Sequence, residues 1–185
     1  MIFAPQEWSD NYALMDGVQS TDPQIIDGNL DTIGQAVLTL ENTSYRLNDN
    51  ADFIRNDSIV VVTLPEKKKI YRIILHSENL KHFVVYVDKG KARKGEDWHR
   101  VIEMRDVMSR KFDLKPKMPY ITDQIKIRIL KTHPQVQKQK TFRLDNLMGS
   151  GRLNETVITN LSRSRHIPGR IREIEIYGFK TSEQQ

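Results

Sequence analysis

Apolar side chains along this chain recur at every second position or in short runs of β-branched residues. Both patterns are typical of β-strands, because successive side chains of a strand point to opposite faces of a sheet. Where charged residues fill the alternate positions, one face is dry and the other wet, which indicates antiparallel sheets that pack on a single side. The pattern predicts strands over residues 58–64, 70–75, 83–87, 124–130 and 171–177.

Turn-forming residues separate these strands at 65–67, 88–90, 94–97 and 116–119. They are groups of proline, glycine and charged residues, which punctuate regular structure. Short helical turns are expected only near residues 33–38. Many short strands with frequent turns favour an all-β jelly-roll β-sandwich of antiparallel strands, and the length of 185 residues suits a single domain over 1–185.

The composition narrows the class of protein further. The chain has no cysteine, so it has no disulfide framework, no thiolate metal site and no cysteine nucleophile. No apolar run reaches the roughly 18 residues needed to cross a bilayer, and the first residues lack the basic and apolar regions of a signal peptide. The formal charge of +5, from 29 basic and 24 acidic residues, is a mild excess that argues against a nucleic-acid partner.

The loop that follows Gln24 carries oxygen ligands at close spacing. Asp27, Asn29 and Thr32 offer three side-chain oxygens within six residues, and Gly28 allows a tight bend. Calcium prefers six to eight oxygen ligands in flexible geometry, so the loop is a candidate calcium site. An EF-hand is excluded, because its sixth position would be Thr32 rather than glycine and its twelfth Leu38 rather than glutamate. The alternative is a plain turn in which Thr32 serves as a cap.

Several short motifs follow one another in a defined order over residues 8–178. They are the Asp27-Gly28-Asn29 turn followed by Thr32, strands ending near Leu64 and covering 70–75 and 83–87, a turn leading into Trp98, and a closing segment 172–178. This order resembles the discoidin or coagulation-factor C-type domain, a galactose-binding-like fold that family 32 carbohydrate-binding modules share. The resemblance implies a module that binds rather than catalyses and that works outside the cell or in the cell envelope.

The same resemblance completes the calcium site and gives Trp98 a role. In the family, backbone carbonyls and a glutamate on the last strand close the clamp. By position these would be the carbonyls of Gln24 and Arg172 and the carboxylate of Glu173. The resemblance also implies that Trp98 plugs the core of the sandwich, with an exposed stacking platform as the alternative.

Ligands of the resembling domains bind to loops at one end of the sandwich. The first candidate loop is 41–57, where Tyr45 offers an aromatic face for a sugar and Arg46 and Asn48 offer hydrogen bonds to hydroxyl groups. The second candidate loop is 76–82. Sugar-binding relatives usually have an arginine where this chain has His76, so specificity for galactose does not transfer.

A long insertion, about 133–167, precedes the last strand and departs from the family pattern. Its basic residues alternate with apolar ones, which favours an acidic partner, although the segment could instead be a hairpin that covers one sheet. Two functions therefore stay open. One is binding of a glycan or cell-surface polysaccharide by the loops, and the other is a protein-protein interaction through the insertion.

The sequence gives little support for an enzyme. It has no glycine-rich phosphate loop, no nucleophile elbow and no zinc-protease motif, and its five histidines are not at metal-ligand spacing. We therefore expect no catalytic residues and no cofactor other than structural calcium.

Overall fold

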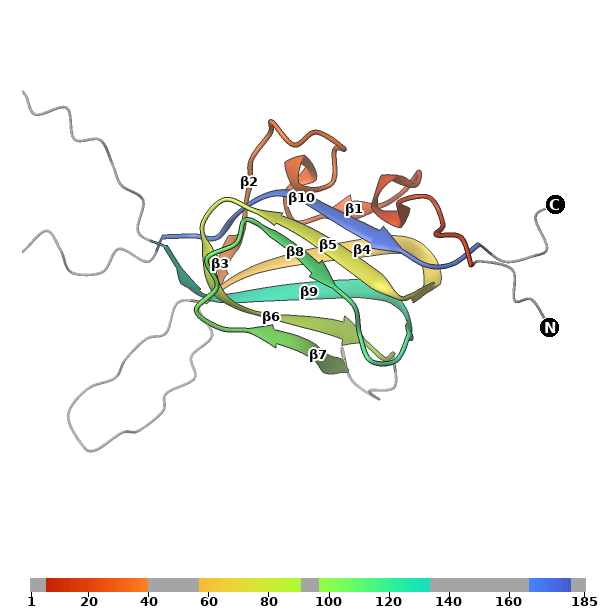
Figure 1. The fold of residues 1–185 in the computed structure, drawn as a ribbon. Helices are drawn as coiled ribbons and strands as arrows, with labels where there is room; N and C mark the ends of the chain where they lie inside the picture. Colours follow the sequence, from red (N-terminus) through yellow and green to blue (C-terminus); the bar gives the residue numbers. More distant parts are fainter. Residues whose placement is uncertain (1–5, 40–56, 91–96, 134–166, 181–185) are drawn as a thin grey trace, which may run out of the picture.

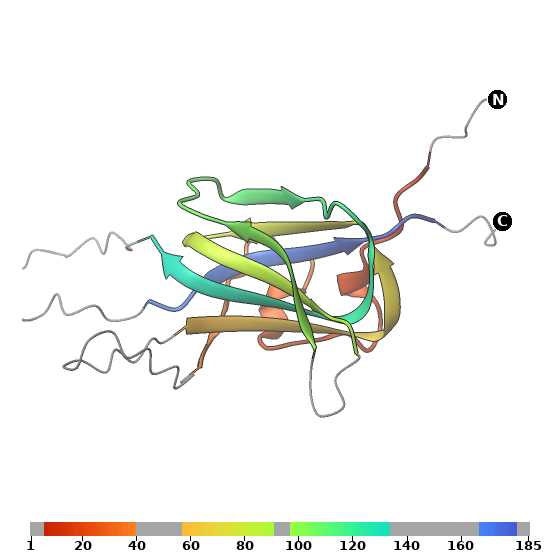
Figure 2. The same ribbon diagram turned by 90° about the horizontal axis from the view of Figure 1, so that it is seen from below.

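The computed structural model describes residues 6–39, 57–90, 97–133 and 167–180, and these form two antiparallel sheets packed face to face (Figures 1 and 2). The strands are β1 (Gln19–Ser20), β2 (Gly34–Gln35), β3 (Val37–Thr39), β4 (Asp57–Ile70), β5 (Arg72–Ser77), β6 (Leu80–Asp88), β7 (Trp98–Met104), β8 (Lys111–Leu114), β9 (Tyr120–Thr132) and β10 (Arg170–Tyr177). Two single-turn 3-10 helices, η1 (Tyr12–Leu14) and η2 (Pro23–Ile25), precede β2. The expected all-β sandwich is confirmed.

The larger sheet has the strand order β1-β4-β9-β6-β7, and β3 also pairs with β4. The long strands β4 and β9 run antiparallel from Ser58 opposite Ile129 to Ile70 opposite Tyr120. The smaller sheet has the order β2-β10-β5-β8. Because β4 and β5 belong to different sheets, the chain crosses between the layers at Tyr71.

The core lies between the two sheets and is built from their inward-facing side chains. The second half of β9 has isoleucine at alternate positions, Ile125, Ile127 and Ile129, and the end of β10 has Ile174 and Ile176 in the same way. These isoleucines are at most 1% exposed, as are Phe83, Val85 and Leu75 on the strands beside them. Burying each side chain of this size contributes about 1.5–3 kcal/mol relative to leaving it in water, so this alternation is the main source of stability.

Three local expectations were wrong. Residues 65–67 are not a turn: they lie inside β4, where a shift of register between Thr63 and Lys68 absorbs the proline. The stretch 33–38 is not helical, since it contains β2 and the start of β3. The segment 76–82 is not a loop, because β5 and β6 are joined by the two residues Glu78 and Asn79 alone.

The expectation that Trp98 plugs the core of the sandwich was also wrong. It lies opposite Asp88 at the start of β7, is half-buried, and is not part of the core between the sheets. The ammonium group of Lys126 lies 4.1 Å from the centre of the Trp98 ring. Tryptophan therefore faces outward from the larger sheet and does not plug the sandwich, whose core is filled by isoleucine, valine, leucine and phenylalanine instead.

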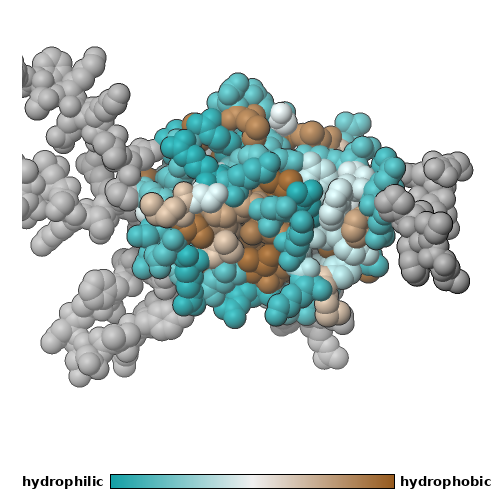
Figure 3. All heavy atoms as spheres, viewed as in Figure 1, coloured by the Kyte–Doolittle hydropathy of each residue, from teal (hydrophilic) through white to brown (hydrophobic). Residues whose placement is uncertain are grey.

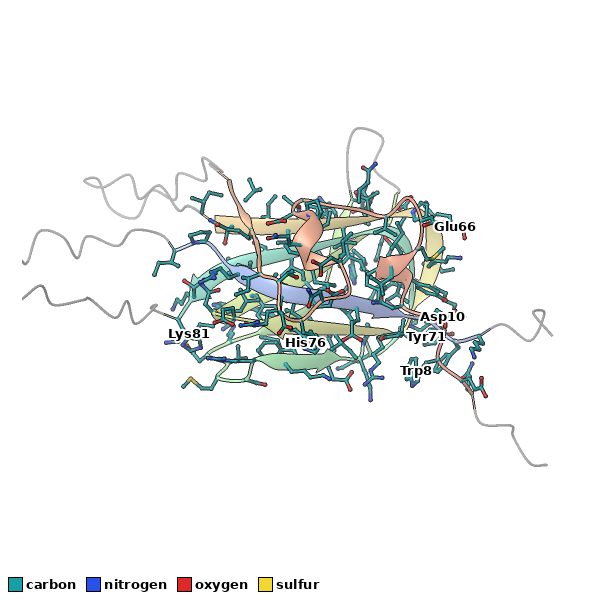
Figure 4. All side chains as sticks on the ribbon, turned by 90° about the horizontal axis from the view of Figure 1, so that it is seen from above. Trp8, Asp10, Glu66, Tyr71, His76 and Lys81 are labelled. Atoms are coloured by element: carbon teal, nitrogen blue, oxygen red, sulfur yellow. The ribbon has the colours of Figure 1, made fainter. Side chains whose placement is uncertain are left out.

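The two ends of the sandwich differ (Figure 4). At the terminal end, Trp8 forms a bridge with Phe179 and stacks on its ring at 4.5 Å between ring centres, and Tyr71 packs on the same ring. At the opposite end, which we call the loop end, β3 and β9 finish and β4 and β10 begin. Figure 4 shows Trp8 and Tyr71 near one end and Lys81 near the other.

No helix in the described parts of the chain is long and apolar enough to cross a membrane.

Candidate functional site

The loop that precedes β2 is held in shape by capping contacts. Asp22 is the N-cap of η2: its Oδ1 accepts a hydrogen bond from the backbone N–H of Gln24 at 3.1 Å, and Pro23 occupies the first helical turn. The other oxygen of Asp22 accepts from the backbone N–H of Gln35 at 2.8 Å. Gly28 has φ of +75°, a conformation that glycine adopts at low cost. The loop is thereby folded back against β10.

Four oxygen atoms surround the hydroxyl group of Thr32. Its Oγ1 lies 3.0 and 2.8 Å from the two carboxylate oxygens of Asp27, 2.7 Å from the carbonyl oxygen of Asn29 and 3.4 Å from the carbonyl oxygen of Gln24. A hydroxyl group carries one proton, so it donates to only one of these acceptors at a time. The hydroxyl group and these four acceptors therefore form a cluster of oxygen atoms, the donor type that calcium prefers.

Glu173 lies on β10 beside this loop and is only 3% exposed. Its Oε2 accepts a hydrogen bond from the backbone N–H of Gly28 at 3.1 Å, whereas its Oε1 is buried and has no hydrogen-bond partner among the described residues. Burial above all, and the negative charges of Asp27 and Glu175, raise the pKa of Glu173 to about 7. A buried carboxyl group of this kind is stabilised either by a proton or by a metal ion.

Most of the predicted metal ligands therefore meet. Gln24, Asp27, Asn29 and Thr32 supply a cluster made entirely of oxygen, and Glu173 lies next to it. Asn29 takes part through its carbonyl, because its side-chain oxygen accepts from the N–H of Asp31 at 3.0 Å. Hard oxygen donors with two carboxylates fit calcium. Among the described residues there is no group of three or more His, Cys, Asp or Glu side chains that could hold a metal, so the proposed ligand set consists of two carboxylates together with a hydroxyl group and carbonyl oxygens.

The side chain of Arg172 has a separate role. Its guanidinium group donates to Glu78 at 2.9 and 2.8 Å and to the carbonyl oxygen of Leu30 at 2.9 Å. Arg172 therefore ties the loop before β2 to the β5–β6 turn, while the ligand predicted from this residue is its backbone carbonyl. The contribution of that carbonyl to a metal site stays a prediction.

His76 lies on β5, on the outer face of the smaller sheet. Its Nε2 is 2.7 Å from Oε1 of Glu175, and the other carboxylate oxygen of Glu175, Oε2, accepts a hydrogen bond from the hydroxyl group of Tyr177. Burial raises the pKa of Glu175, whereas these hydrogen bonds lower it, and the pKa lies below its usual value. Figure 3 shows this side of the molecule, where hydrophilic residues surround a smaller hydrophobic area. His76 thus belongs to a cross-strand polar network, and its role as a ligand contact stays a prediction.

The remaining predicted ligand contacts, Tyr45, Arg46 and Asn48, lie outside the described residues, as does nearly all of the insertion 133–167. The residues that flank both segments meet at the loop end. Ser58, at the start of β4, pairs with Ile129 near the end of β9, and its hydroxyl accepts from the N–H of Gly169 at 3.2 Å. Thr132 donates to the carbonyl oxygen of Ile167 at 3.2 Å.

Asn79 organises this end and was not identified from the sequence. It is 5% exposed, and its side chain donates to the carbonyl oxygen of Pro168 at 3.2 Å and accepts from the N–H of Arg170 at 2.8 Å. Its own carbonyl accepts from the N–H of His133 at 2.7 Å. One turn residue therefore fixes both flanks of the insertion. The sequence offers no signal for this beyond a polar residue between two strands.

Carbohydrate-binding modules have similar structures. Chitosan-binding module 1 of a chitosanase/glucanase from Paenibacillus sp. IK-5 matches with a TM-score of 0.54 and 12% identity over 92% of this chain and 100% of that module. The family 32 module of Clostridium perfringens NanJ, solved in complex with galactose, matches with a TM-score of 0.50 and 12% identity over 87% and 92%. The family 32 module of Streptococcus pneumoniae EndoD gives 0.53 and 10% over 91% and 99%.

No protein-family model matches the sequence, and no curated protein matches it. At the identities of the structural matches, the likeness concerns the fold. It extends over nearly the whole of the chain and of each module, and it agrees with the motif order in the sequence. The chain thus has the discoidin-type, galactose-binding-like fold of the family 32 carbohydrate-binding modules.

Proposed function

We propose that this chain is a non-catalytic recognition module that binds carbohydrate through the loop end of the sandwich. The observation that carries this proposal is the convergence of the flanks of 40–56 and 134–166 at the end opposite Trp8 and Phe179. A rigid sandwich that presents its long connecting segments together is suited to recognition, because the scaffold positions loop side chains at little cost to itself.

Two arguments support carbohydrate as the ligand. Similar modules were solved with chitotriose and with galactose. In this chain, Tyr45 would stack on the C–H face of a sugar, and Arg46 and Asn48 would hydrogen-bond to its hydroxyl groups. A module of this kind would deliver an attached protein to a glycan or a cell-surface polysaccharide, outside the cell or in the cell envelope.

Calcium is the second element of the proposal, and its role is structural. Asp27, Thr32 and the carbonyls of Gln24 and Asn29 would bind the ion together with Glu173. The ion would neutralise a buried carboxylate and join the loop before β2 to the last strand. It supplies no chemistry to a reaction, because the site is a closed set of oxygen ligands in this proposal.

A protein partner for the basic insertion is the second candidate. The segment 134–166 contains six basic and two acidic residues, so it carries four of the five net positive charges of the chain. Such a concentration of charge favours an acidic surface on a partner. The two functions are compatible, since one concerns the insertion and the other 41–57.

A glycan panel tests the primary proposal. The full chain, with calcium present, is screened against neutral and acidic glycans, beside a variant with Tyr45→Ala and Arg46→Ala. We expect selective binding that the double variant loses while its melting temperature is unchanged. A control is Met118→Ala, which removes an exposed apolar side chain between β8 and β9 and is expected to bind like the wild type. A well-folded chain that binds no glycan would reject carbohydrate recognition.

A further inference from the structure

Positive charge exceeds negative charge in the described segments around the β5–β6 turn, at the loop end of the sandwich. These segments are 77–82, 103–111, 130–133 and 167–172, and they contain seven Lys and Arg residues but three Asp and Glu residues. Each of the three acidic side chains already has a cation beside it. The ion pairs are Arg172 with Glu78 at 2.8 Å, Arg105 with Glu103 at 2.7 Å and Lys81 with Asp106 at 3.8 Å. Four cations therefore remain without an acidic partner in these segments.

Three of these four cations, Arg110, Lys131 and Arg170, border the turn itself. Their side chains make no ion pair or hydrogen bond with another described residue, and those of Arg110 and Lys131 are exposed. The fourth, Lys111, lies opposite His76 in the smaller sheet and belongs to its outer face. We call Arg110, Lys131 and Arg170 the turn cations.

The backbone of Arg110 is fixed on both sides, although its guanidinium group has no partner among the described residues. Its carbonyl oxygen accepts a hydrogen bond from the N–H of Ser77 at 2.6 Å. The hydroxyl group of Ser109 donates to the carbonyl oxygen of Lys111 at 2.8 Å and accepts from the N–H of the same residue at 3.2 Å, so it bridges across Arg110. The chain thus holds a charged group in place that it does not itself neutralise.

Arg170 is held in the same way on the other side of β5. Its N–H donates to the side chain of Asn79 at 2.8 Å, and its carbonyl oxygen accepts from the N–H of Glu78 at 3.0 Å. Arg110 and Arg170 therefore bond to consecutive residues, Ser77 and Glu78, from opposite sides. Neighbouring strands lie about 4.8 Å apart, so the backbones of the two arginines are about 10 Å apart, and both side chains can reach one acidic sugar.

Lys131 borders the turn from the larger sheet. It pairs with His82 between β9 and β6. Two residues later, the N–H of His133 donates to the carbonyl oxygen of Asn79 at 2.7 Å. The turn cations therefore come from three different segments that converge on one turn.

We infer that the turn cations form a subsite for a carboxylate group, so that the glycan bound at the loop end carries an acidic sugar, a uronate or a sialic acid. The inference rests on the proposed function, because it names the class of sugar that the same end of the sandwich binds. Arg110 and Arg170 offer planar charged donors, which match the two oxygens of a carboxylate. Since their backbones are already fixed, binding orders only their side chains, which favours affinity.

A nucleic acid fits this site less well than an acidic glycan. It presents a dense line of phosphates and is usually bound by a strongly basic patch. Outside the segment 134–166 the chain has a net charge of only +1, which is small for such a patch. Three cations around a single turn suit a ligand with few, separated charges.

Probes that differ only in the carboxylate test the subsite. A hyaluronan oligosaccharide supplies uronates and sialyllactose supplies a sialic acid, and each is compared with its carboxyl-reduced form, in which the carboxylate is a primary alcohol. Affinities for the full chain with calcium are measured by calorimetry at low and at high salt, beside a DNA duplex. We expect one of the acidic probes to bind at least about tenfold more tightly than its reduced form, a difference of about 1.4 kcal/mol. This preference should shrink with salt, because exposed charges are screened.

A pair of variants assigns the preference to the turn. Arg110→Gln with Lys131→Gln removes two exposed charges, should keep the melting temperature of the wild type, and should reduce the preference for the acidic probe to within about threefold. Lys89→Gln with Lys117→Gln is the matched control. It removes the same charge from exposed positions after β6 and between β8 and β9, and it should keep the full preference.

The outcomes separate this inference from the proposed function. Reduced probes that bind as tightly as the acidic ones would overturn the carboxylate subsite and leave carbohydrate recognition intact. The same holds if the variant with Arg110→Gln and Lys131→Gln keeps the preference, or if the control loses as much of it. DNA bound more tightly than both acidic probes would also overturn the inference. A folded chain that binds neither these probes nor any neutral glycan would reject the proposed function, and this inference with it.

Discussion

Glu173 on the last strand accepts a hydrogen bond from the backbone N–H of Gly28, a residue that lies 145 positions earlier in the chain. This contact joins the beginning of the domain to its end. It uses only one oxygen of a buried carboxylate, and the other oxygen has no hydrogen-bond partner among the described residues. The calcium proposal gives that oxygen a role, and it leads to the first two predictions.

Calcium should stabilise the domain. An ion that binds only the folded state raises the free energy of unfolding by about 2.7 kcal/mol at a hundred times its dissociation constant. We expect EDTA to lower the melting temperature by several degrees and Asp27→Ala to abolish the effect of calcium. Asp31→Ala is the matched control, because Asp31 lies in the same loop outside the oxygen cluster. Identical melting curves with calcium and with EDTA would contradict the clamp.

Without calcium, stability should fall as the pH rises. The pKa of Glu173 is raised from its ordinary value of 4.5 to about 7 in the folded state. The folded state therefore binds this proton more tightly than the unfolded state, and the resulting stability is complete below about pH 4.5 and is lost as the pH rises through about 7. The full change is up to about 3 kcal/mol.

Denaturant titrations in EDTA between pH 5 and pH 8 measure this effect. Glu173→Gln should flatten the pH dependence, since the amide does not ionise. Calcium should reverse the trend in the wild type, because the ion binds the ionised carboxylate. A wild type in EDTA whose stability is the same at pH 5 and pH 8 would count against a neutral, buried Glu173.

Asn79 should support the loop end without touching a ligand. Asn79→Ala removes hydrogen bonds to Pro168 and Arg170 and leaves their half-buried backbone groups with fewer partners, at a cost of about 1–3 kcal/mol. We expect lower stability together with weaker glycan binding. Gln35→Ala, an amide exposed on the edge strand β2, is the control and should change stability by less than about 0.5 kcal/mol. Unaltered denaturation of the Asn79 variant would show that this turn does not organise the end.

Gly178 should tolerate no side chain. A Cβ atom there would collide with the Tyr12 hydroxyl and would lie 2.7 Å from the carbonyl oxygen of Lys69. The backbone oxygen moves only with its strand, so we expect Gly178→Ala to destabilise the domain by about 1–3 kcal/mol. Lys180→Ala, exposed two residues later, is the comparison. Equal denaturation midpoints for the two variants would show that the terminal end packs more loosely than described.

The strands with the strongest alternation could be predicted from the sequence. The predicted strands fall within β4, β6, β9 and β10, at residues 58–64, 83–87, 124–130 and 171–177. A shift of register by one residue would turn their apolar side chains away from the core, so the pattern fixes these strands. The order of motifs also indicated the discoidin-type fold. In both cases the information is local, or depends on the succession of local signals.

The remaining features depend on contacts between distant segments. The run of strand-forming residues is unbroken at Tyr71, where the chain passes from β4 to β5. The single strand predicted over 70–75 therefore divides between two sheets. Trp98 was assigned to the core by position, but the pairing of β7 with β6 places it on the outer face. The gathering of Gln24, Asp27, Thr32 and Glu173 was expected from the resemblance, since spacing alone does not bring Glu173 to the loop.

Mapping the bound glycan by nuclear magnetic resonance tests carbohydrate recognition at the loop end most directly. The full chain, with calcium, is titrated with the neutral glycan that binds best in the panel, and the amide signals that move are assigned. We predict that they cluster among residues that border the loop end, such as Val37, Lys131 and Ile167, and that those of Trp8 and Phe179 stay in place. Movement confined to the terminal end, or no glycan that binds at all, would contradict the account.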